Sequence, residues 1–435
     1  MKMRISTEKS KLQTSKLLTN YFCVLFLIAL YYLWYRYPFR INSSGTSPTY
    51  SDTPYILQIL KYTLFFATVG IFTVLPLLAR RSRWPRYRLG WWMAIVIVVW
   101  FIVQSGLVAI ITSDLVHFES VIFLFALIPL MFYSRSFKIR LTIIERFLRW
   151  FIYITTASFV LQVLLFITVG RLPALAYQGS LFVRFGGLWD DPNGFAVFLS
   201  FIIPFIYFSE MRHSRKILLI VINLVSLIAT QSLTGIFAFV ASLFLVTGCL
   251  FLRPVARQWA RRIGMIYLWL AIFAFVGLTA LMIFNLKFDL TGLAIRYLEG
   301  KQPSMNIHME SWSMITQGTG LPTILGMEPT GRLVESGYAT LLLNFGVFTL
   351  LAYVLFLLAI FWKTINVLRA YHDQPGIAVF YGAAFFSAAY GVAMLNLPLQ
   401  TVFPINLLFI LFAILAFQTY RIVDWQDLAN SDVGR

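Results

Sequence analysis

The chain has 435 residues, of which 60% are hydrophobic and only 12% are charged. A water-soluble chain of this length needs more charge on its surface, so the composition excludes a soluble globular protein and indicates a polytopic membrane protein. The formal net charge of +18 would also suit a nucleic-acid-binding protein, but the placement of these charges along the chain argues against that class. Because lipid cannot satisfy backbone polar groups, the predicted fold class is all-α.

In chain order, the apolar runs predict about twelve membrane-spanning helices within a single integral membrane domain, residues 1–435. The first run follows basic residues, and no small-residue cleavage site comes after it, so we interpret it as a retained span rather than a signal peptide. The predicted spans are Leu17–Tyr35, Tyr55–Ala79, Trp91–Ile111, Val116–Tyr133, Trp150–Val169, Gly194–Phe208, Ile217–Thr230, Gly235–Leu252, Gly264–Leu286, Tyr338–Trp362, Ile377–Leu395 and Ile405–Tyr420.

The basic residues predict the orientation of these spans. With the N-terminus placed inside, 26 of the 35 lysines and arginines fall in alternate loops. The positive-inside rule then places both termini in the cytoplasm, and it explains most of the net charge without nucleic acid. The remaining cations include Arg184, Arg296 and Arg332, which lie in or near the outer loops, where topology alone gives no reason for cations.

Two outer loops carry the polar residues that are candidates for function. The first covers 171–193, and the second, 287–337, is a large extracytoplasmic loop between spans nine and ten. Within the second loop, helical spacing of apolar residues in Asn306–Gln317 predicts a surface helix at the membrane interface.

The stretch Arg184–Gly194 reads Arg-Phe-Gly-Gly-Leu-Trp-Asp-Asp-Pro-Asn-Gly and precedes an apolar span. Pro192 and Asn193 indicate a turn that begins the next helix, with Asp191 or Asn193 as its cap. One interpretation is a well-capped loop between two spans and nothing more. The other is an anion and sugar site at a helix N-terminus, where the helix dipole and free amides favour phosphate.

The outer loops also supply residue types that suit glycan and diphosphate chemistry. Arg184 and Arg296 suit phosphate because the planar guanidinium donates two hydrogen bonds at once. Glu335 or Asp191, if partly desolvated, can remove a proton from a hydroxyl. The candidate sugar contacts are Asp190, Asn193, His308, Trp312, Arg332 and Tyr338.

Each candidate also has a simpler interpretation. Arg184 and Arg296 fit cations at the membrane interface, and Asp190 fits a solvated turn residue. Glu335 fits an acid that favours the N-terminus of the next helix, and Trp312 fits an interfacial anchor. Because the outer loops hold one histidine and both cysteines lie in apolar runs, we expect no metal and no other cofactor.

A polar break, Gln231–Gly235, separates two further apolar runs. It fits a tight hairpin at the outer surface. Alternatively, it lines a polar cavity that faces Arg184.

Three parts of the chain resemble the bacterial O-antigen ligase and polysaccharide polymerase superfamily of integral membrane proteins. The stretch Arg184–Ala196 is similar to that family's arginine, glycine and Pro-Asn run ahead of a span, and Thr230–Gly235 is similar to its polar step between adjacent spans. The third part is Trp312 and Gly326 followed by Glu335-Ser-Gly-Tyr338, then Asn344 and Gly346.

The sequence departs from the family pattern at three positions. Leu233 stands where many members carry an arginine, and His308 stands where an arginine is often seen four residues before the tryptophan. Glu335 occupies roughly the place of the histidine of ligases, and this difference favours a polymerase.

The resemblance implies glycosyl transfer on the outer face of the bacterial cytoplasmic (inner) membrane, in O-antigen, lipopolysaccharide or exopolysaccharide biosynthesis. The donor would be an oligosaccharide on undecaprenyl diphosphate, and the acceptor a hydroxyl of another lipid-linked repeat unit. Arg184 and Arg296 would bind the diphosphate, and Glu335, or Asp191, would act on the acceptor hydroxyl. Expected partners are this lipid-linked glycan, membrane lipids and a chain-length regulator. The alternatives are a ligase that transfers finished glycan to lipid A core and a polysaccharide transporter or flippase.

Overall fold

The computed structural model describes residues 17–35, 54–78, 123–129, 139–169, 184–189, 191–251, 320–326, 334–372, 374–400, 402 and 404–417, with scattered positions in 96–110 and 302–313. The regular structure of these residues is helical, which confirms the all-α fold class. Most of the predicted spans 91–111 and 116–133, the whole of span 264–286 and most of the loops 171–193 and 287–337 lie outside the described residues, so the count of twelve stays a prediction.

Five of the described helices are long and apolar enough to cross a membrane. They are Leu17–Tyr35, α2 (Tyr55–Leu78), α6 (Leu141–Val169), α9 (Leu233–Phe251) and α13 (Gly337–Ala370). The shorter helices are α7 (Pro192–Phe208), α8 (His213–Ala229), α14 (Ala378–Ala393), α15 (Ile405–Phe417), α12 (Leu321–Ile324) and the 3₁₀ helix η2 (Phe123–Leu127).

Two helices extend well beyond the apolar runs that predict them. Helix α6 begins at Leu141 rather than Trp150, and α13 continues to Ala370 rather than ending near Trp362. The added turns carry charged residues, which a search for apolar runs passes over. The backbone hydrogen bonds of a helix form within the helix itself, both inside and outside the membrane. A helix can therefore continue past the last apolar residue of a span.

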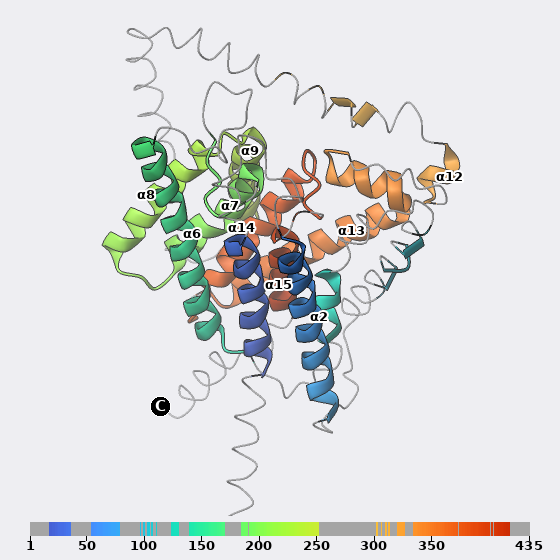
Figure 1. The fold of residues 1–435 in the computed structure, drawn as a ribbon, viewed down its shortest axis with the longest axis horizontal. Helices are drawn as coiled ribbons and strands as arrows, with labels where there is room; N and C mark the ends of the chain where they lie inside the picture. Colours follow the sequence, from blue (N-terminus) through green and yellow to red (C-terminus); the bar gives the residue numbers. More distant parts are fainter. Residues whose placement is uncertain are drawn as a thin grey trace, which may run out of the picture.

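Helix α14 lies at the centre of the described bundle (Figure 1), where it packs against α7, α9, α13 and α15. Small side chains let its neighbours approach closely: a Cβ at Gly382 would overlap the ring of Phe201 in α7. The rings of Phe208 and Tyr381 stack with centroids 3.7 Å apart, so α7 and α14 stay in contact as far as the end of α7. The hydrophobic core therefore lies between α14 and the helices around it.

The helix Leu17–Tyr35 and α2 run side by side near the lower centre of Figure 1. The rings of Tyr21 and Phe72 join them, with centroids 5.0 Å apart. Lys61 of α2 is only 4% exposed, and its Nζ lies 4.0 Å from the centroid of the Tyr62 ring.

The described helices of the main bundle alternate in direction, so the bundle has two different ends. Helices α7, α9, α13 and α15 begin at one end, where α6, α8 and α14 finish, and we call this the polar end. There the backbone N–H of Phe185 donates to the carbonyl oxygen of Ala229 at 3.0 Å, and that of Gly337 donates to Met394 at 2.9 Å. The two sequence motifs around Arg184 and Glu335 both lie at the polar end.

At the opposite end, which we call the basic end, α6, α8 and α14 begin. Gly376 packs against Leu141, and the guanidinium of Arg369 donates to the carbonyl oxygen of Cys249, so the ends of α9 and α13 meet there. Its described basic residues are Arg140, Arg146, Arg149, Arg212, Arg215, Lys216, Lys363 and Arg369.

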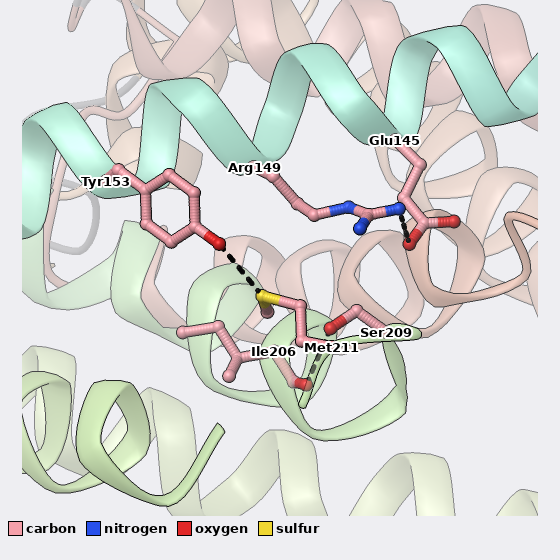
Figure 2. A network of polar contacts seen from close by, with 6 residues as sticks. All are labelled: Glu145, Arg149, Tyr153, Ile206, Ser209 and Met211. Carbon is pink, nitrogen blue, oxygen red and sulfur yellow. Dashed lines mark hydrogen bonds and ion pairs between the residues drawn. The ribbon is translucent and has the colours of Figure 1, made fainter. Parts of the chain in front are cut away.

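Figure 2 shows how α6 is joined to the end of α7 at the basic end. Arg149 and Glu145 form an ion pair at 3.0 Å on one face of α6, and the Glu145 side chain is only 3% exposed. One turn further along α6, the hydroxyl of Tyr153 donates to the sulfur of Met211 at 3.3 Å. The basic end is thus tied together by side chains, and not by apolar packing alone.

Helix α13 is broken at Gly346, where φ is +80° and ψ is +173°, a conformation accessible essentially to glycine. The turn after α12 lies directly against this break, because a Cβ at residue 346 would come within 2.6 Å of the backbone nitrogen of Gly326. Gln104 donates to the carbonyl oxygen of Gly326 at 2.8 Å, and Trp100 donates to the hydroxyl of Thr349 at 2.7 Å. The break therefore separates a short first part of α13, next to the polar end, from the long remainder.

Candidate functional site

Arg184 is held in one orientation by the surrounding chain. Its Nε donates to the carbonyl oxygen of Thr230 at 2.9 Å, and its Nη2 donates to Oδ1 of Asn193 at 2.8 Å. The side chain is only 8% exposed. A guanidinium fixed in this way presents an oriented fork rather than a mobile point charge. The structure thus brings Arg184, Asn193 and the α8–α9 turn together.

Gln162 in the last third of α6 fixes the glycines that follow Arg184. Its Nε2 donates to the carbonyl oxygen of Gly187 at 3.0 Å, and the Gly187 N–H donates to Oε1 at 2.8 Å. Gly187 has a φ of +58°, which explains the glycine at this position. Sequence reasoning missed Gln162, although a single amide inside an otherwise apolar span is a visible signal of a buried polar contact.

Asp191 caps α7. Its Oδ1 accepts from the backbone N–H of Asn193 at 2.9 Å, and its Oδ2 accepts from that of Gly194 at 3.2 Å. Pro192 occupies the first turn, as its fixed φ favours. The predicted helix start is confirmed, with Asp191 as the cap. Both carboxylate oxygens are directed at the backbone, so Asp191 is less well placed than Glu335 to act on a ligand.

The polar break Gln231–Gly235 is a tight turn next to Arg184, because the carbonyl oxygen of Thr230, the residue just before the break, accepts from the arginine Nε. Within it, the hydroxyl of Ser232 accepts from the Gly235 N–H at 3.0 Å and caps α9. A Cβ at Gly235 would overlap that of Ala196 in α7, so α7 and α9 cross here in backbone contact. The tightness of the turn agrees with the hairpin interpretation, while its place at the outer surface and a polar cavity beside it stay predictions.

The start of α13 is docked on the end of α14. Ser336 is the N-cap of α13, and its hydroxyl accepts from the Ala339 N–H at 3.3 Å. The hydroxyl of Tyr338 donates to the carbonyl oxygen of Gly391 at 2.7 Å. Glu335 is exposed just ahead of this cap. The carboxylate is therefore accessible at the surface of the polar end, while the residues after it fix its position.

The connection between α14 and α15 joins the two motifs, and sequence reasoning gave it no role. On one side, a Cβ at Gly194 would lie 2.9 Å from Ile405 and 3.8 Å from Val402. On the other side, a Cβ at Gly337 would lie 2.7 Å from the Oε1 atom of Gln400. The Arg184 motif and the Glu335 motif thus border the same short piece of chain, from residue 394 to residue 405.

The other predicted site residues are less well placed by the structure. Trp312 is helical and 39% exposed. Its helical neighbours Met309 and Glu310 are exposed as well, which agrees with the surface helix predicted for 306–317. Asp190, Arg296, His308 and Arg332 lie outside the described residues. Their roles stay predictions.

Several positively charged or partially positive groups gather at the polar end. Four helix N-termini, those of α7, α9, α13 and α15, lie there together with the oriented guanidinium of Arg184. Helix N-termini carry positive partial charge and backbone N–H groups, and both attract phosphate. Within the described part of the chain, no group of three or more His, Cys, Asp or Glu side chains is arranged to hold a metal ion.

Comparison with known proteins gives no family assignment for this chain. No protein-family model matches it, and no curated protein matches it. The case for a function therefore comes from the residues and the geometry of the polar end.

Proposed function

We propose that this protein is a membrane glycosyltransferase that joins oligosaccharide repeat units carried on undecaprenyl diphosphate, a polymerase acting at the outer face of the cytoplasmic membrane. One observation carries the proposal: the motif of the oriented Arg184 guanidinium and the motif of the exposed Glu335 carboxylate lie at the same end of the bundle and border the same α14–α15 connection. A cation for a leaving diphosphate and a carboxylate base for an incoming hydroxyl are the two groups that this reaction needs.

The proposed step exchanges one bond for another at the anomeric carbon of the donor sugar. The acceptor hydroxyl oxygen forms the new bond to this carbon, while the bond from the carbon to the phosphate oxygen breaks. The electron pair of the broken bond leaves with undecaprenyl diphosphate, and Glu335 takes the hydroxyl proton. Direct attack inverts the configuration of the anomeric carbon.

Arg184 acts on the charge that develops on the leaving diphosphate. Because Thr230 and Asn193 already orient the guanidinium, it needs no rearrangement as this charge appears. Arg296, outside the described residues, is the second cation of the proposal. Asp190, Asn193, His308, Trp312, Arg332 and Tyr338 are its proposed glycan contacts.

Two other functions compete with this one. A ligase performs the same bond exchange with lipid A core or another acceptor, and Glu335 in place of a histidine argues for the polymerase. A transporter or flippase is favoured by Lys61, a cation buried within α2, because charged residues inside spans often mark transport pathways. Bond formation by purified protein in detergent separates the enzyme from the transporter, since detergent micelles have no two sides.

The substitution Arg184→Lys tests the proposal. A point charge cannot replace the bidentate fork that Thr230 and Asn193 orient, so we expect product formation to fall about 100-fold or more. The measurement is polymer length on gels, using lipid-linked repeat units extracted from cells that lack this protein. Polymer made at the normal rate by the Arg184→Lys protein would remove Arg184 from the reaction.

A matched control is Arg215→Lys, at the exposed start of α8 and at the basic end. It makes the same chemical change far from the proposed site, and we expect normal polymer from it. Both variants are compared at equal amounts of protein in the membrane, so that a loss of product reports the reaction rather than insertion.

A further inference from the structure

Gln400, in the connection between α14 and α15, has a buried hydrogen-bond acceptor that the described chain does not use. The side chain is only 6% exposed, and its Oε1 has no hydrogen-bond partner among the described residues. Buried amide oxygens are nearly always paired, so one that is not calls for an explanation.

The orientation of this amide is set by its other atom. The Nε2 of Gln400 donates to the carbonyl oxygen of Gly337 at 3.4 Å. Exchanging the two amide atoms would place oxygen against oxygen there, so Oε1 is the atom left without a donor. It lies 2.7 Å from the position that a Cβ of Gly337 would take, and the glycine makes this close approach possible.

Three described polar groups near the Gln400 side chain are already paired with other partners. The N–H of Gly337 donates to Met394, and the N–H of Ala339 donates to Ser336. The backbone carbonyl of Gln400 itself accepts from Nδ2 of Asn406 at 3.1 Å. Among these groups, the acceptor without a donor is therefore Oε1 of Gln400 itself.

We propose that Oε1 of Gln400 accepts a hydrogen bond from a hydroxyl group of the acceptor sugar, an inference that rests on the proposed glycosyl transfer. Gln400 touches the first turn of α13, directly after the exposed Glu335, so one sugar residue can meet both side chains. Glu335 takes the proton of the reacting hydroxyl, and Gln400 holds a second hydroxyl of the same acceptor. Gln400 is thus a binding residue, and no proton or electron pair passes through it.

The acceptor reaches this oxygen by displacing the outer part of the connection. Leu395 is 42% exposed, and Asn396 and Leu397 are half-buried, so this part of the chain has little packing on its outer side to lose. The hydrogen bond gained by Oε1 favours the displaced arrangement only when a hydroxyl donor is present.

The test compares Gln400→Met with the unaltered protein. Methionine matches the size of glutamine but has no acceptor oxygen. The donor is the lipid-linked repeat unit extracted from cells that lack this protein, and the acceptor is the free oligosaccharide released from that lipid by mild acid. We expect Gln400→Met to raise KM for the free oligosaccharide about 10-fold with kcat little changed.

The control is Gln374→Met, in the connection at the basic end, where Oε1 also has no partner among the described residues. It should leave KM unchanged. KM does not depend on the fraction of protein that is folded, so poor folding of Gln400→Met lowers only the apparent kcat. An unchanged KM in Gln400→Met would overturn the role of Gln400 alone, whereas the absence of product from unaltered protein would overturn the proposed function.

Discussion

The contacts of Arg184 stabilise the polar end and also orient a charged side chain that can bind an anion. Its guanidinium closes the loop onto the α8–α9 turn through Thr230 and links that turn to Asn193 at the start of α7. These hydrogen bonds use part of the donor fork and fix the plane of the rest. A role in structure and a role in anion binding are compatible here, because the same contacts that stabilise the loop orient the charge.

Glu335 has a clearer separation between the two roles. Ser336, and not Glu335, caps α13, so a structural role for the carboxylate is limited to its charge near the helix N-terminus. Such a charge contributes about 0.3–1 kcal/mol at an exposed position.

The substitution Glu335→Gln therefore separates these roles. It keeps the shape and removes the basicity, and as a lost general base it should lower kcat about 100-fold or more. The measurement is initial rates of polymer formation, with thermal unfolding in detergent measured in parallel. Full activity, with or without a small fall in melting temperature, would show that Glu335 serves only the helix.

Residues that act through neighbours in sequence were predictable, and residues that act across the bundle were not. Asp191 precedes Pro192 and Asn193, so its capping role can be read from local chemistry alone. Gln162 and Gln400 make their contacts with chain segments far away in sequence. The residues next to a glutamine in the sequence do not indicate which distant segment it contacts.

At the scale of elements, Gly235 controls the closest approach of two helices. A Cβ at this position would overlap that of Ala196, so α9 can cross α7 only because residue 235 has no side chain. From the sequence alone, Gly235 can equally be interpreted as a turn residue. The crossing of α7 and α9 shows that helix packing requires a glycine at this position.

The variant Gly235→Ala should lower the free energy of unfolding by about 1–3 kcal/mol through overpacking. Gly248→Ala, on the same helix with nothing within 4 Å of the added Cβ, is the control and should be neutral or slightly stabilising. The double variant Gly235→Ala/Ala196→Gly moves the methyl group from one helix to the other and should recover most of the loss. The measurement is thermal unfolding in detergent, and equal destabilisation by both glycine variants would contradict the crossing.

Some features of the helices can be predicted from neighbouring residues, and others depend on contacts with distant parts of the chain. Apolar runs predict that α7, α9, α14 and α15 exist and roughly where they lie, because each run must be kept from water. They do not predict the break in α13, which depends on Gly346 meeting Gly326 from another part of the chain. Gly346 is visible in the sequence, but its neighbour is not.

At the scale of the whole molecule, the separation of charged residues between two ends predicts sidedness. The basic end should face the cytoplasm and the polar end the outside. The proposed reaction needs this arrangement, because its lipid-linked substrates are displayed at the outer face.

Single cysteines can test the orientation in a background in which Cys23 and Cys249, both within apolar helices, are replaced. Leu395→Cys at the polar end should react with a membrane-impermeant maleimide in intact cells. His213→Cys, exposed at the basic end, should react only after permeabilisation. The reverse pattern would place the polar end in the cytosol and exclude the proposed reaction there.

The shortness of the central helices has a consequence for how a lipid substrate arrives. Helices α7, α14 and α15 have 17, 16 and 13 residues. At about 1.5 Å per residue they rise about 25, 24 and 20 Å, less than the hydrocarbon thickness of about 30 Å. Nearly all described residues of these three helices are buried by other parts of the chain, so the central helices can stop short of the headgroup level. The starts of the central helices would then be within reach of a diphosphate whose polyprenyl tail stays in the bilayer. The lipid substrate would not need to be lifted out of the membrane.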